Sequence, residues 1–151
     1  MATTLFTAKP YDEAKVRRKR IRIIAACLAV MLVVGFGIAF RHWPYEHRVN
    51  KFFDALEAKD FEKAYGIWFN DPNWKTHPQD FTRYKYGEFY LDWGPGGEYG
   101  IIKEHSIDGA TSSGPWETGS GVIVQITVNK RAEPVRIWIE RKDKTFGFSP
   151  F

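Results

Sequence analysis

Residues 23–40 read IIAACLAVMLVVGFGIAF, eighteen consecutive residues without a charge or a proline, and this run constrains the fold more than any other segment. An α-helix rises about 1.5 Å per residue, so the run is about 27 Å long as a helix, close to the hydrocarbon thickness of a bilayer. A helix also satisfies its backbone hydrogen bonds internally, as lipid requires. The sequence therefore predicts one transmembrane helix over residues 22–41.

Charge is distributed unequally on the two sides of this run. Residues 1–40 contain seven Lys or Arg and two Asp or Glu, a net charge of +5. Residues 41–151 contain fifteen Lys or Arg and sixteen Asp or Glu, a net charge of −1. Because cytoplasmic flanks carry the excess of cations, we expect residues 1–21 to be a basic cytoplasmic tail and residues 42–151 an extracytoplasmic domain.

The residues that border the run suit a lipid interface: Arg22, Arg41, Trp43 and Tyr45. Pro44 predicts that the helix breaks just after the span. The cations of the tail lie where an anionic leaflet attracts them, so we expect the lipid bilayer, and not nucleic acid, as a partner. The short chain, which lacks an Asn-x-Ser/Thr site, and its layout indicate a single-pass protein of a bacterial inner membrane.

Two processed forms are alternatives to a retained span. A cleaved signal peptide has an apolar region of about 7–15 residues followed by a small-x-small site, but here the run is longer and lacks such a site at its end. Residues 24–27 match the letters of a lipobox, but at the start of the run instead of its end. We therefore expect Cys27, the only cysteine, to be an ordinary apolar residue in lipid.

Three helices are predicted after the span. An apolar stripe at spacing i, i+3, i+4 and i+7 predicts the first: Val49, Phe52, Phe53 and Leu56. Asp60 is a candidate N-cap for the second, whose stripe is Phe61, Ala64, Tyr65 and Trp68. A capping box at residues 76–79 predicts a third helix over 77–92, with Phe81, Tyr84 and Leu91 on its apolar stripe, ended by the Gly-Pro-Gly-Gly of residues 94–97.

The period then changes from 3.6 to 2, which predicts strands over residues 99–107, 122–128, 135–139 and 145–148. In the third strand Val135, Ile137 and Ile139 alternate with Arg136, Trp138 and Glu140 on the opposite face. Helices followed by strands with short turns predict an α+β fold, in which about three helices pack on a curved antiparallel sheet of about four strands.

Residues 49–68, VNKFFDALEAKDFEKAYGIW, resemble the opening of the nuclear-transport-factor-two-like (cystatin-like) superfamily. The resemblance implies a cone-shaped α+β domain, with a short strand between the second and third helices for which residues 70–75 are a poor match. The layout of basic tail, single span and outer domain is similar to the inner-membrane scaffold subunit of type IV secretion machines and to membrane-anchored accessory proteins of lipid importers, whose outer domains are longer.

The superfamily contains isomerases, dehydratases, ligand binders and protein-binding members, so the resemblance leaves two classes of function open. We expect a non-enzymatic domain that binds or scaffolds another membrane or envelope protein. The alternative is binding or isomerisation of a small apolar ligand in the cone, which needs an acid or base and an oxyanion-stabilising group near its mouth. The candidate residues for a pocket or a partner surface are Tyr65, Trp68, Tyr84, Glu88, Asp92, His105, Trp116 and Trp138.

The two classes differ in where the aromatic residues point. If Tyr65, Trp68, Tyr84 and Trp138 fill the cone, no ligand fits; a cavity with Glu88 or Asp92 at its floor would favour the ligand. Residues 109–121 form a polar connection centred on Trp116, which either lids the cone or anchors a partner, or only packs on the sheet. The four histidines lack metal-ligand spacing, so no metal or cofactor is expected.

Overall fold

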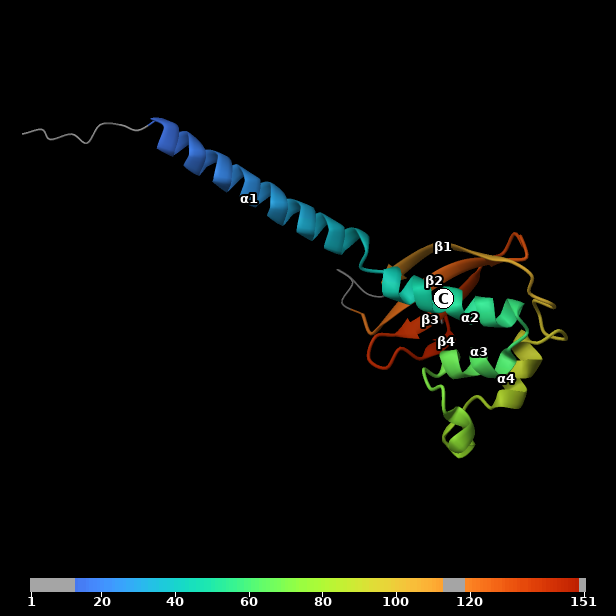
Figure 1. The fold of residues 1–151 in the computed structure, drawn as a ribbon. Helices are drawn as coiled ribbons and strands as arrows, with labels where there is room; N and C mark the ends of the chain where they lie inside the picture. The colour runs from blue at the N-terminus through green and yellow to red at the C-terminus, as the bar shows by residue number, and fades with distance from the viewer. Residues whose placement is uncertain (1–12, 113–118, 150–151) are drawn as a thin grey trace, which may run out of the picture. The chain divides into compact units, whose positions relative to one another are not determined.

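The computed structural model describes residues 13–112 and 119–149, and the chain divides into two compact units, residues 1–41 and 42–151. The first unit contains helix α1, Glu13–Ala39, which buries none of its residues (Figure 1). Leu32 and Val33 are 73% and 72% exposed. This is the one helix of the described residues that is long and apolar enough to cross a membrane, with a mean hydropathy of 2.8 over eighteen residues.

Helices α2, Trp43–Glu57, and α3, Phe61–Trp68, begin the second unit. Pro44 lies in the first turn of α2, where its missing N–H costs no hydrogen bond, so the predicted break is confirmed as the start of a new helix. The predicted N-cap is also confirmed, because the Asp60 carboxylate accepts a hydrogen bond from the backbone N–H of Lys63 at 3.1 Å.

The prediction of a third helix over residues 77–92 is wrong in its first half. Two 3₁₀ turns, Trp74–Thr76 and Pro78–Asp80, replace it, and helix α4 runs only from Tyr86 to Trp93. Thr76 does not cap a helix, because its hydroxyl donates to the Asn73 carbonyl at 2.9 Å. The helix start is instead capped by Glu88, whose carboxylate accepts a hydrogen bond from the backbone N–H of Lys85 at 2.9 Å.

Four antiparallel strands form one sheet in the order β1-β2-β3-β4: His105–Ser112, Gly121–Val128, Val135–Glu140 and Phe146–Phe148. The last three confirm the prediction. The first strand lies later than predicted, because the 99–104 stretch precedes the ladder and a bulge at Gly109 carries the pairing on to Ser112. The predicted connection of residues 109–121 is therefore shorter, and begins after Ser112.

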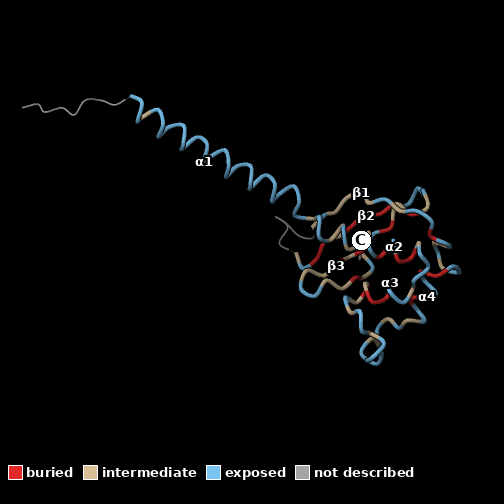
Figure 2. Tube along the Cα trace, in the orientation of Figure 1, coloured by how far each residue is buried: buried red, intermediate tan, exposed pale blue. Residues whose placement is uncertain are grey.

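Helix α2 packs against β1 and β2, α3 packs against α2, and α4 packs against α3, so that the helices and one face of the sheet enclose a single core. Figure 2 shows that the buried residues of the helices and strands lie in the interior of this domain. The core is rich in aromatic rings. The Phe52 ring alone lies 5.2–6.1 Å from five others: Phe53, Trp68, Phe89, Trp93 and Phe146.

Candidate functional site

Tyr65 and Trp68 lie inside this core, only 1% and 2% exposed. The Tyr65 hydroxyl donates to the Tyr84 carbonyl at 2.7 Å. Burial, together with the charge of Glu88, raises the pKa of Tyr65 to about 12, so the phenol stays neutral. The Trp68 ring packs between the helices and β4, whereas the Tyr65 ring packs among α3, α4 and the segment that joins them.

Trp138, the fourth aromatic candidate, lies apart from these residues. Its strand alternates, so that Ile137 and Ile139 face the core while Trp138 is half-buried on the opposite face of the sheet. There the indole N–H donates to Glu140 at 3.2 Å, and the ring covers Gly121, where a Cβ atom would collide with it. The sheet therefore separates Trp138 from the other aromatic candidates.

Tyr84 and Asp92, both candidates from the sequence, meet at the end of the domain where α4 stops. The Tyr84 hydroxyl donates to the Asp92 carboxylate at 2.7 Å. Burial raises the pKa of Tyr84, and the hydrogen bond and charge of Asp92 raise it further. The indole of Trp93 is buried beside them, and its Nε1 lies near the Tyr84 hydroxyl without a hydrogen bond of good geometry in the described residues.

An open hollow of about 450 Å³ lies at the same place, lined by Leu91, Asp92, Trp93, Gly96, Gly97, Glu98, Tyr99 and Phe148. Leu91 is 72% exposed and Phe148 is 59% exposed, which contradicts the prediction that Leu91 belongs to a buried stripe. Two carboxylates, Asp92 and Glu98, stand beside these apolar groups and are exposed. We refer to the five residues Leu91, Asp92, Trp93, Tyr99 and Phe148 as the α4 surface.

The hollow is not the acid-floored cavity that ligand chemistry would need. Asp92 lies at its exposed rim with one carboxylate oxygen bonded to Tyr84, and Glu88 is turned to the start of α4. A neutral phenol that already donates to a carboxylate is not a free general acid. What the α4 surface offers chemically is an apolar contact with acidic groups next to it.

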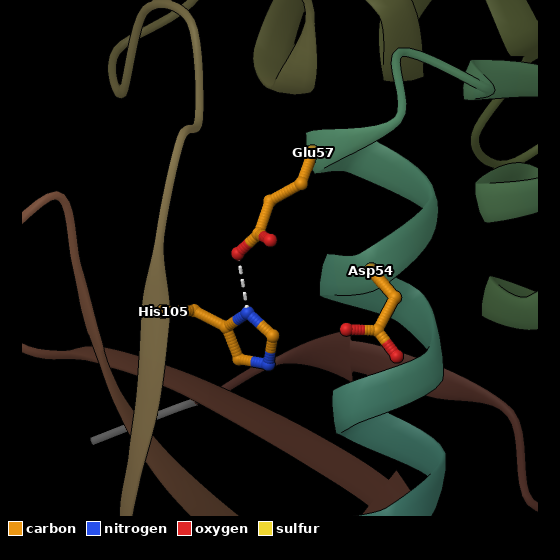
Figure 3. Close-up of side chains that lie close together, drawn as sticks. All are labelled: Asp54, Glu57 and His105. Carbon is orange, nitrogen blue, oxygen red and sulfur yellow. Dashed lines mark hydrogen bonds and ion pairs between the residues drawn. The ribbon is translucent and has the colours of Figure 1, made fainter.

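His105 lies between β1 and α2, where Figure 3 shows it with Asp54 and Glu57. The ligand atoms of these three residues lie within 4.8 Å of one another, so they could approach one metal ion. However, the His105 Nδ1 lies 2.6 Å from a Glu57 oxygen and its Nε2 lies 3.0 Å from the Asn50 amide oxygen. Because a metal needs one of these ring nitrogens, it would have to displace Glu57 or Asn50.

The geometry at His105 is that of a clamp between β1 and α2. The ring also stacks on Phe53 at 5.2 Å, and its side chain is 9% exposed. His105 is therefore a buried residue held by hydrogen bonds from both ring nitrogens. Glu57 and Asn50 lie two turns apart on one face of α2, and no sequence pattern linked them to a histidine about fifty residues later.

Sequence reasoning also missed Arg48, which lines an open groove between α2 and α3. Its guanidinium donates to the Ile67 carbonyl and to the Asn70 side chain, both at 2.6 Å, and lies 5.4 Å from the centre of the Phe146 ring. Burial lowers the pKa of Arg48. The signal was its spacing, because Arg48 precedes Phe52 by four residues and therefore lies over the apolar stripe of α2. Arg48 ties α2 to the end of α3.

The interface residues that flank the span are all exposed or half-buried. Trp43 is 54% exposed and stacks on His47 at 5.0 Å, and the Tyr45 hydroxyl accepts a hydrogen bond from Lys144 at 3.0 Å. Trp116 lies outside the described residues.

Comparisons of the chain with protein-family models, with curated proteins and with solved structures gave no match.

Proposed function

We propose that this chain is a single-pass protein of a bacterial inner membrane, with its N-terminus in the cytoplasm, whose outer cystatin-like domain binds another membrane or envelope protein without catalysis. The α4 surface is the observation that carries this proposal. It exposes Leu91 and Phe148 beside an open hollow of about 450 Å³ on a domain whose core is otherwise well filled. Large apolar groups at the edge of a hollow are typical of a protein contact.

The filled core argues against a ligand cavity inside the domain. Trp68 lies 5.2–6.0 Å from the rings of Phe52, Phe89, Trp93, Phe146 and Phe148. A drug-sized ligand needs about 300 Å³ or more of space, which these rings occupy. A partner that stays on the surface needs no such space.

The energy available at the α4 surface is appropriate for a specific contact. Burying an exposed Leu or Phe side chain contributes about 1.5–3 kcal/mol, so Leu91 and Phe148 together offer about 3–6 kcal/mol before the costs of association. Asp92 and Glu98 favour a partner whose apolar side chain is flanked by a lysine or arginine, since like charges would be excluded. Helix α1 supports the proposal as the tether that keeps the domain at the membrane.

Site-specific photo-crosslinking in intact cells tests this proposal. A photoreactive residue at Leu91 or at Phe148 is expected to give one and the same cross-linked product, while the same residue at Ser106 gives none. Ser106 is the matched control because it is exposed on β1, away from α4. The absence of a product at Leu91 and Phe148, or equal products at all three positions, would contradict the proposal.

The contact between Tyr84 and Asp92 allows a test of the alternative function, the binding of a small apolar ligand. A small apolar ligand with a hydrogen-bonding group could occupy the same open hollow, beside the buried Trp93 indole. Binding of such compounds should then raise the melting temperature of the full-length protein, and Tyr84→Phe should abolish the rise.

A further inference from the structure

Three parts of the chain meet at the end of the domain where α2 begins. The Ser112 hydroxyl, at the end of β1, lies 3.1 Å from Nε2 of His42. The turn between β3 and β4 reaches the same place, because the Lys144 amine donates to the Tyr45 hydroxyl at 3.0 Å and lies 4.4 Å from the centre of that ring. Figure 1 shows the start of α2 and the red β3–β4 turn at one end of the domain. We call this end the α2-start surface.

Only a short segment of chain joins α1 to the α2-start surface. Helix α1 ends at Ala39 and α2 begins at Trp43, so residues 40–42 are the whole connection. Even fully extended, this connection reaches only about 14 Å. The apolar run ends at Phe40, and the headgroup region beyond the hydrocarbon is about 5–8 Å thick on each side.

The exposed side chains on the α2-start surface suit a layer of phospholipid headgroups. Trp43, 54% exposed, has the amphipathic ring that is common at this depth. Lys142, exposed in the β3–β4 turn, carries an amine that phosphates bind. The acid in this turn, Asp143, is engaged by the backbone N–H and the hydroxyl of Thr145, at 2.9 and 2.7 Å. Lys142 is therefore the exposed cation of this turn, since Lys144 and Arg141 are held by Tyr45 and Ser112.

Two further carboxylates, Glu140 and Glu46, lie at this end, and neither cancels the positive charge of the β3–β4 turn. Glu140 accepts a hydrogen bond from the Trp138 indole on the outer face of the sheet. Glu46 lies in the first turn of α2, where the helix dipole favours it, and is only half-buried. The segment Arg141 to Lys144 has three cations and one acid, so the turn has a net positive charge.

We propose that the α2-start surface rests on the phospholipid headgroups of the membrane that α1 spans, with Trp43 in the interface and Lys142 on lipid phosphates. This inference depends on the proposed membrane anchor. Helix α2 then begins at the membrane surface, and its far end contacts α4, since Leu56 and Trp93 line one small hollow.

Fluorescence quenching in nanodiscs tests this orientation with the full-length protein. The nanodiscs contain phosphatidylcholine and phosphatidylglycerol, and a fraction of the lipid carries a nitroxide on its headgroup. With Cys27→Ala as background, a fluorophore is attached to Ser120→Cys or, as a control, to Glu133→Cys. Ser120 adjoins the β3–β4 turn, because its carbonyl accepts from the Arg141 N–H at 2.7 Å, while Glu133 lies in the exposed turn between β2 and β3.

We expect quenching to be severalfold stronger at position 120 than at position 133. Adding Lys142→Glu to the Ser120→Cys protein should weaken the quenching, whereas Lys103→Glu, an exposed lysine outside this surface, should not. Equal, weak quenching at both positions in nanodisc-bound protein would overturn the headgroup contact and leave the anchor intact. An unchanged signal with Lys142→Glu would overturn the role of this lysine, and failure of the protein to enter nanodiscs would overturn the anchor as well.

Discussion

Replacing Trp68 with alanine separates a filled core from an open cone. The Trp68 side chain is 2% exposed, and six aromatic rings lie within 5.2–6.0 Å of its own: Phe52, Tyr84, Phe89, Trp93, Phe146 and Phe148. Removal of such a group loses its transfer free energy and leaves a cavity that rigid neighbouring rings cannot close. A buried Trp→Ala change typically costs about 3–5 kcal/mol of unfolding free energy. In an open cone the same residue would line solvent or ligand, and its loss would cost little.

The expected loss is easily measured. For a domain of this size, about 4 °C of melting temperature is lost per kcal/mol, so Trp68→Ala should lower the midpoint by about 12–20 °C. Urea unfolding of the full-length protein in detergent micelles, followed by far-UV circular dichroism, gives the free energy without depending on the lost fluorophore. The denaturant slope should stay unchanged, because the surface exposed on unfolding is nearly the same.

Trp138→Ala is the matched control for this measurement. It removes an identical side chain from the outer face of the sheet, where Trp138 is only half-buried. Its loss should cost about 1–2 kcal/mol, mainly through the contact with Gly121. If Trp68→Ala cost less than about 1 kcal/mol, or no more than Trp138→Ala, then the core would not be packed as described and the case against an internal ligand would fail.

Three further changes test individual contacts by thermal or chemical unfolding. Asp60→Ala removes the N-cap of α3 and should cost about 1 kcal/mol, whereas Asp60→Asn should retain most of the stability. Glu57→Ala leaves one nitrogen of the buried His105 ring without its acceptor and should cost about 1–3 kcal/mol, and a larger loss for Glu57→Gln would argue against the clamp. The pKa of Tyr65 is raised to about 12, so its contribution is complete below its unfolded pKa of about 10 and is lost as the pH rises toward 12. Tyr65→Phe should flatten this alkaline decline, and an unchanged profile would show that Tyr65 does not cause it.

Elements with a strong local signal were predictable from the sequence. The four apolar residues of α2 and the Asp60 cap of α3 are local patterns, and both helices lie where these patterns indicate. Strands β2 and β3 alternate strictly, so their inner faces were also predictable. That alternation already assigns Trp138 to the face opposite Ile137 and Ile139, where the structure has it.

The segment between α3 and α4 was not predictable, because distant contacts determine its path. His77 Nε2 lies 2.6 Å from the Asp71 carboxylate, and the Tyr84 carbonyl accepts from the Tyr65 hydroxyl. These contacts replace the helical hydrogen bonds that the Thr76 capping pattern predicted. Once α4 begins at Tyr86, Phe89 and Trp93 form its buried face, and Leu91 must lie outside.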